Sequence, residues 1–163
     1  MKKILCFVTV FFLVLTNVLA DDNVTFTAGI SVNEVPVELF GSWKVTAKLD
    51  DTNSYRTFKP QSADLWTLSR TDDVITLSNP FSGATAQISL KTVEGNLIIF
   101  SKETPFENKV LNDIVSIRLN KKDFSGINTL TLKHISPVDG HVVKTENARY
   151  IIKGEKLSGE DVL

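Results

Sequence analysis

Cysteine is almost absent from this 163-residue chain, since Cys6 is the only one and lies in the first apolar run. Beyond that run there is no thiol for a disulfide framework, a thiolate metal site or a nucleophile. A surplus of positive charge is also missing, with 18 Lys and Arg against 19 Asp and Glu. We therefore expect no nucleic-acid partner. Hydrophobic residues at 42% and charged residues at 23% exclude a disordered tract, so a packed core must hold the fold.

The first twenty residues have the features of a secretory signal peptide. Two lysines follow the initiator methionine, residues 4–15 form an apolar run, and Val18 and Ala20 place short side chains before a cleavage site. The apolar run is shorter than the ~20 residues of a transmembrane helix. We predict a signal peptide over 1–20, cleavage after Ala20 and a secreted or periplasmic mature chain.

Strand signals dominate the rest of the chain. Short runs rich in Val, Ile, Thr and Leu alternate with turn residues, and no long stretch with a helical period competes. We predict an N-terminal strand and connector over 21–37, followed by one all-β barrel domain over 38–163. The predicted strands of this antiparallel meander lie near 24–32, 43–49, 54–58, 64–70, 74–79, 84–92, 96–102, 109–120, 127–136 and 141–153.

Two turns set the expected faces of their strands. Asp139-Gly140 indicates a tight hairpin that places Leu130 and Leu132 on the same face as Arg149.

The second turn is Glu94-Gly95-Asn96. Its hairpin places Leu90 with Ile99 and turns Ile98 and Phe100 to the other face, away from the core.

The segment 24–32 alternates strictly between apolar and small polar side chains, which predicts a strand with one apolar face. Pro36 separates it from the strand that begins near residue 43. We expect this strand to pack over Ile98 and Phe100, either within the chain, between two copies as a homodimer, or against a protein partner.

Residues 39–45, Leu-Phe-Gly-Ser-Trp-Lys-Val, resemble the opening of the first barrel strand in lipocalin-like proteins. In that family a Gly-x-Trp motif starts the strand, and the indole closes the base of the barrel. The likeness spans about residues 38–157 and is to the short bacterial exported forms, since the Thr-Asp-Tyr motif, C-terminal helix and disulfide of classical lipocalins are absent. The resemblance implies an up-and-down barrel of about eight to ten strands. It also implies an arginine across the tryptophan, so Trp43 and Arg149 are the expected barrel-base pair.

If the Trp43 face continues inward, small and medium aliphatic side chains line the barrel. The candidate ligand-binding residues are Val45, Ala47, Ala86, Ile88, Leu90, Ile99, Ile117, Leu119, Leu130 and Leu132. The alanines leave volume for a cavity, which favours a non-catalytic binding protein for a small apolar ligand. The alternative is a filled barrel that serves as a structural or protein-interaction module of the cell envelope.

Residues for catalysis or metal binding do not assemble from the sequence. The only histidines, His134 and His141, are ~13 Å apart at the strand rise when the Asp139-Gly140 turn is tight, which is too far to share an ion. No Gly-x-Ser-x-Gly elbow or Gly-rich phosphate loop occurs. We expect no catalytic residues, metal or cofactor. The carboxylates whose mutual positions the sequence leaves open are Asp64, Glu94, Glu103, Asp113 and Asp123.

A transmembrane β-barrel would also fit an exported chain of this length. Half of the predicted strands, however, are shorter than the ~9–11 residues that such barrels need. Only four Trp and Tyr residues are present for two interfacial girdles. We therefore expect no transmembrane segment in the mature chain.

Overall fold

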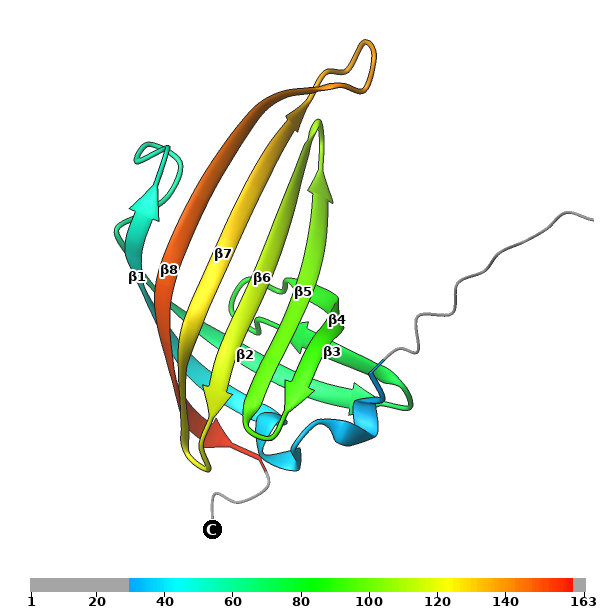
Figure 1. The fold of residues 1–163 in the computed structure, drawn as a ribbon, viewed down its shortest axis with the longest axis vertical. Coiled ribbons are helices and arrows are strands. Elements are labelled where there is room, and N and C mark those ends of the chain that lie inside the picture. Colours follow the sequence, from blue (N-terminus) through cyan, green and yellow to red (C-terminus); the bar gives the residue numbers. More distant parts are fainter. Residues whose placement is uncertain (1–29, 160–163) are drawn as a thin grey trace, which may run out of the picture.

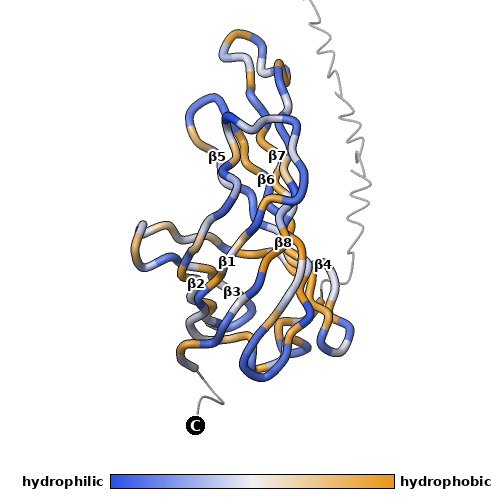
Figure 2. The backbone as a smooth tube through the Cα atoms, turned by 90° about the vertical axis from the view of Figure 1, so that its left-hand side faces the viewer, coloured by the Kyte–Doolittle hydropathy of each residue, from blue (hydrophilic) through white to orange (hydrophobic). Residues whose placement is uncertain are grey.

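The computed structural model describes residues 30–159 and shows a closed up-and-down barrel of eight antiparallel strands, each paired with its neighbours in chain order (Figure 1). The all-β meander predicted from the sequence is confirmed. Hydrophobic and hydrophilic residues are interspersed along the strands, as expected where one face is buried (Figure 2). The strands are β1 (Gly41–Thr52), β2 (Gln61–Thr71), β3 (Val74–Ser78), β4 (Thr85–Glu94), β5 (Leu97–Phe106), β6 (Lys109–Leu119), β7 (Asp123–Ile135) and β8 (Val142–Ser158).

Several predicted elements differ from the structure. Residues 54–58 form turns in the β1–β2 loop rather than a strand. All strands except β3 have 10 to 17 residues, so most are longer than predicted. Residues 24–29 of the predicted N-terminal strand lie outside the described residues. The end of that segment is not a strand, because Val32 begins a 3₁₀ turn.

Two short 3₁₀ turns, η1 (Val32–Glu34) and η2 (Val37–Leu39), precede β1 at the base of the barrel (Figure 1). The Ser31 hydroxyl accepts from the Asn33 amide, and the Glu34 carboxylate accepts from the Ser31 amide, so a capping box starts η1. Val32, Val35 and Leu39 are buried in the core. The segment before β1 therefore packs into the base of the barrel through isolated apolar side chains. Within residues 30–159, no helix is long and apolar enough to span a bilayer.

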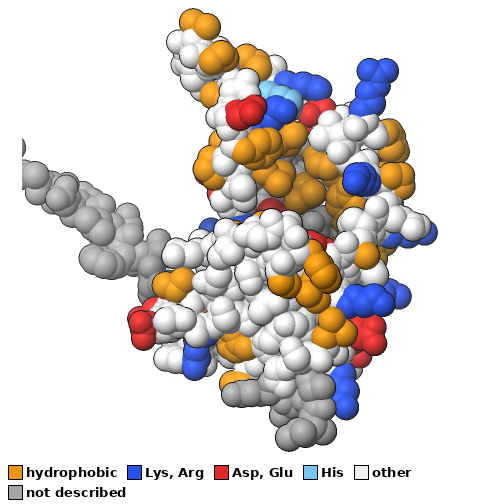
Figure 3. All heavy atoms as spheres, turned by 180° about the vertical axis from the view of Figure 1, so that it is seen from behind, with side chains coloured by type: hydrophobic (Ala, Val, Ile, Leu, Met, Phe, Trp, Pro, Cys, Tyr) orange, Lys and Arg blue, Asp and Glu red, His pale blue; other side chains and the backbone are white. Residues whose placement is uncertain are grey.

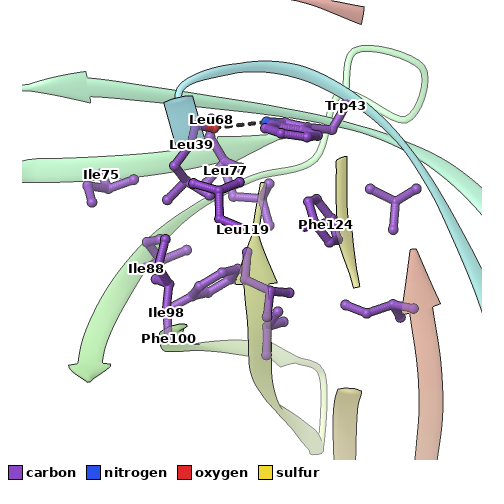
Figure 4. Close-up of a cluster of buried hydrophobic side chains, with 14 of the residues drawn as sticks. Leu39, Trp43, Leu68, Ile75, Leu77, Ile88, Ile98, Phe100, Leu119 and Phe124 are labelled. Atoms are coloured by element: carbon purple, nitrogen blue, oxygen red, sulfur yellow. Dashed lines mark hydrogen bonds between the residues drawn. The ribbon is translucent and has the colours of Figure 1, made fainter. Parts of the chain in front are cut away.

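The barrel base is packed around Trp43, which is fully buried (Figure 4). Its indole Nε1 donates to the Leu39 carbonyl at 2.8 Å, so η2 is held directly against β1. The Phe124 ring lies 5.1 Å from the Trp43 ring and 6.0 Å from the Trp66 ring, measured between centroids. Such contacts add about 0.5–1.5 kcal/mol to the burial of each aromatic pair.

Glycine is needed at two places in this base. Gly41 has a φ of +126°, and a Cβ there would lie 2.1 Å from the Ser158 carbonyl oxygen. The Phe124 ring covers Gly154 of β8, where a Cβ would lie 2.2 Å from the ring. The first glycine lets the ends of β1 and β8 approach closely, and the second makes room for the aromatic stack.

The predicted facing of β5 was wrong. Ile98 and Phe100 are fully buried, and Ile99, predicted as a lining residue, lies on the outer face. The turn has the expected two residues, but the pairing of β4 with β5 shifts by one residue at Lys91, between Leu90 and Thr92. Because side chains alternate with a period of two, this β-bulge exchanges the two faces of β4 relative to β5. No outward pair of Ile98 and Phe100 exists for residues 24–32 to cover.

The predicted barrel-base pair was also wrong in its second member. Arg149 is on the outer face, where its Nε donates to Asp50 at 2.7 Å, and its side chain is 57% exposed. The predicted tight Asp139-Gly140 hairpin was wrong, because the pair nearest the turn is Ile135 with Val142. The pairing of β7 with β8 then shifts by one residue between His134 and Ile135, so Leu130 lies opposite Ala148, and Arg149 lies opposite Thr129.

The cation over Trp43 is instead Lys156. Its Nζ lies 5.5 Å from the centre of the indole and donates to the Glu38 carbonyl at 2.8 Å. Lys156 is only 8% exposed. The base is therefore closed by a cation from β8, as the resemblance implied, but by a residue seven positions later in the strand.

Candidate binding site

The barrel holds an open cavity of about 320 Å³ above its packed base, and we call this cavity the cup. Trp66 connects the two regions, because it lines the cup and also stacks on Phe124 of the base. Seen from behind, hydrophobic side chains gather around a hollow in the upper half of the molecule (Figure 3). The aliphatic side chains that line the cup are Val45, Ala47, Leu77, Ala84, Ala86, Leu111, Leu130 and Ile152.

The predicted lining residues divide into three groups. Four of them line the cup: Val45, Ala47, Ala86 and Leu130. Five are in or packed against the core: Ile88, Leu90, Ile117, Leu119 and Leu132. Ile99 lies outside the barrel, as described above. Large aliphatic residues thus fill one part of the barrel, and alanines line the part that stays open.

Sequence reasoning missed a polar group in the cup, formed by Lys102 of β5, Asp113 of β6 and Asn128 of β7. The Lys102 ammonium lies 2.8 Å from the Asp113 carboxylate, and these side chains are 20% and 9% exposed. The Asn128 amide nitrogen donates to the other oxygen of Asp113. A signal was present in the sequence, because Asp113 occupies an inward position in the alternating apolar run that continues with Val115, Ile117 and Leu119.

The bonding of Asp113 fixes the orientation of the Asn128 side chain. An ionised carboxylate only accepts hydrogen bonds, so the NH₂ group of Asn128 faces Asp113 and its Oδ1 points elsewhere. Within residues 30–159 that Oδ1 accepts no hydrogen bond, and the Lys102 ammonium, which has three N–H donors, bonds only to Asp113. The polar group therefore has one acceptor and further donors left for a bound molecule.

A second carboxylate lies at the rim of the cup. Asp64 is exposed and accepts from the Asn79 side-chain amide. The Asn79 Oδ1 in turn accepts from the Phe81 and Ser82 amides at 2.9 and 3.2 Å, which orders the β3–β4 turn. Asp64 gives the rim a negative charge that no cation among residues 30–159 pairs with.

Glu146 organises a separate polar cluster on β8. It is 3% exposed, and Lys144, Ser54, His134 and Thr57 contact its carboxylate at 2.7, 2.6, 2.8 and 3.0 Å. These hydrogen bonds, that of Lys144 first, hold the pKa of Glu146 far below its usual range. The cluster attaches the β1–β2 loop to β7 and β8.

Metal ligands do not converge in the described part of the chain. No group of three His, Cys, Asp or Glu side chains there is arranged to hold an ion. His134 bonds to Glu146, and His141 is exposed near the β7–β8 turn.

Comparison with known proteins adds little to this description. No family model matches the chain, and no curated protein matches its sequence. Among solved structures, the chain is similar to EF1p2_mFAP2b bound to DFHBI, with 13% sequence identity and a TM-score of 0.34. That match covers 74% of this chain and 94% of the other. A likeness at this level carries no argument about function, which has to come from the cup itself.

Proposed function

We propose that the chain is an exported, lipocalin-like binding protein that holds one small, largely apolar ligand in the cup without covalent chemistry. The observation that carries the proposal is the open cavity of about 320 Å³ inside the barrel, above the base packed around Trp43. Ligand sites in proteins typically have volumes of about 300–1,000 Å³. The cup therefore suits a molecule of one or two rings or a short acyl chain.

The walls and the floor of the cup support binding of an apolar body. Aliphatic side chains come from strands on all sides, and Trp66 adds an aromatic face on the packed base. Burying an apolar ligand there stabilises the complex by roughly 25 cal/mol for each Å² removed from water. The base does not need to rearrange, because Trp43 and Phe124 already fill it.

The absence of covalent chemistry is part of the proposal. The polar group of the cup is a lysine–aspartate ion pair with an amide, and it contains no hydroxyl, thiol or imidazole group. The alternative function, an envelope interaction module, combined a filled barrel with an outer surface near Ile98, Phe100 and residues 24–32. Since Ile98 and Phe100 are inside the barrel, they do not contribute to such a surface, and the open cup favours binding over a filled barrel.

Export is the part of the proposal that rests on the first twenty residues alone. Expression of the full chain in a bacterial host, followed by N-terminal sequencing of the periplasmic fraction, tests it. We expect a mature protein that begins at Asp21. A chain retained in the cytoplasm with residues 1–20 intact would contradict this part without affecting the binding proposal.

Filling the cup tests the binding proposal. Ala86 lines the cup, and the next residue, Gln87, is exposed on the outer face of the same strand. We expect the wild type to bind the uncharged fluorophore N-phenyl-1-naphthylamine saturably, with one site per chain. Ala86→Trp should weaken this binding at least tenfold, whereas Gln87→Trp should leave it unchanged. Equal binding by both variants and the wild type would exclude the cup as the site.

A further inference from the structure

We infer that the cup selects an uncharged ligand in which a hydrogen-bond donor stands beside an acceptor, as in a carboxamide. This inference rests on the proposed function and adds the chemical class of the ligand. Three residues carry it: Lys102, Asp113 and Asn128, one from each of the adjacent strands β5, β6 and β7.

The charges in the cup favour a neutral ligand. Lys102 and Asp113 neutralise each other at 2.8 Å, so the interior of the cup offers no net charge to an ionised head group. An ion buried without a counter-charge loses its hydration and gains no compensating attraction. Asp64 is exposed to water at the rim, which screens its repulsion of an anion and its attraction of a cation to the same extent. The rim therefore adds only a small disadvantage for an anion.

The unused hydrogen-bonding atoms specify the ligand further. The Lys102 ammonium can donate to a ligand carbonyl, and the Asn128 Oδ1 can accept from a ligand N–H or O–H. A carboxamide presents both groups on adjacent atoms, whereas an ether or an ester lacks the donor. A ligand without these groups would exclude solvent from the two side chains and leave them without hydrogen-bond partners, which makes sites of this kind selective.

The test uses three probes that share one apolar body and differ in charge: 2-naphthamide, 2-naphthoate and 2-naphthylmethylammonium. Their affinities are measured by titration calorimetry at pH 7 and low ionic strength. We expect 2-naphthamide to bind at least tenfold more tightly than either ion, with naphthoate the weakest. Tighter binding of either ion by the wild type would overturn the inference, and a preference for the ammonium probe would point to Asp64.

Single substitutions that remove one charge of the Lys102–Asp113 pair should shift this selectivity towards a ligand of the opposite charge to the residue that remains. Asp113→Asn leaves the Lys102 ammonium without its carboxylate, so naphthoate should gain at least tenfold in affinity relative to 2-naphthamide. Lys102→Met leaves the Asp113 carboxylate without its cation, so the ammonium probe should gain similarly. Glu103→Gln is the matched control, since it makes the same charge change as Asp113→Asn at an exposed position next to Lys102. Its selectivity should equal that of the wild type.

The outcomes separate this inference from the proposed function. Folding of each variant is checked by circular dichroism, and either polar variant alone is sufficient for the test. If the probes bind and Ala86→Trp blocks them, but Asp113→Asn and Lys102→Met leave the selectivity unchanged, only the inference fails. If no probe binds to the wild type, or Ala86→Trp has no effect, the proposed function fails and the inference falls with it.

Discussion

Lys156, and not Arg149, should hold the base of the barrel together. Lys156 is buried over the Trp43 ring and donates to the Glu38 carbonyl. A desolvated cation–π contact contributes about 2 kcal/mol, and a hydrogen bond from a charged group about 1.5–3 kcal/mol. Burial of the methionine side chain offsets part of this loss. We expect Lys156→Met to lower the free energy of unfolding by about 2–4 kcal/mol.

The matched changes at Arg149 and Lys153 should be far milder. Arg149 forms an ion pair with Asp50 at a surface where its side chain is 57% exposed, and such pairs contribute about 0.2–1 kcal/mol. Lys153 is exposed on the outer face of the same strand, so Lys153→Met should change stability by less than about 0.5 kcal/mol.

Urea denaturation followed by tryptophan fluorescence measures all three variants under the same conditions. Equal losses for Lys156→Met and Arg149→Met would refute this reasoning and return Arg149 to the role that the sequence suggested. A loss for Lys153→Met as large as that for Lys156→Met would show that removal of any positive charge from β8 is sufficient.

Three further predictions concern the core and the pH dependence. Trp43→Phe should lower the free energy of unfolding by about 1–3 kcal/mol, because the buried Leu39 carbonyl loses its donor. Trp43→Ala should lower it by about 3–5 kcal/mol. Equal urea midpoints for Trp43→Phe and the wild type would contradict this. Gly154→Ala should cost about 1–3 kcal/mol, since its Cβ displaces the Phe124 ring; an unchanged thermal midpoint would show that the ring can move freely. The partners of Glu146 lower its pKa in the folded state, so their stabilisation is complete at neutral pH and is lost as the pH falls from about 4.5, the ordinary glutamate value. The urea midpoint should therefore fall less between pH 6 and pH 3 in Glu146→Gln than in the wild type, and equal falls would be the contrary result.

Much of the fold followed from the alternation of side chains along the chain. Apolar runs with a period of two, separated by turn residues, led to the all-β meander and to most of its strand positions. The resemblance of residues 39–45 to the opening of a lipocalin-like barrel implied that Trp43 is buried at one end, where the structure has it. These features are local, because strand propensity and turn chemistry act over a few neighbouring residues.

The candidate site was less predictable for the same reason. Ala47 and Ala86 indicated spare volume, and both line the cup. Asp113 was among the carboxylates whose positions the sequence left open, but nothing in the sequence indicated that Lys102 and Asn128 lie next to it. Those three residues meet only because β5, β6 and β7 pair in one particular register.

Register was the property that only the tertiary structure decided. Single-residue shifts, at Lys91 in β4 and near His134 in the β7–β8 pair, turned Ile98 and Phe100 inward and Arg149 outward. A β-bulge adds one residue to one strand without a distinctive residue type, so the sequence pattern on either side of it looks unchanged. A bulge forms at the position that lets the whole barrel bury the most apolar surface and form the most favourable hydrogen bonds between strands. That balance depends on strands far apart in the chain, such as β1 and β8, and so appears only when the barrel closes.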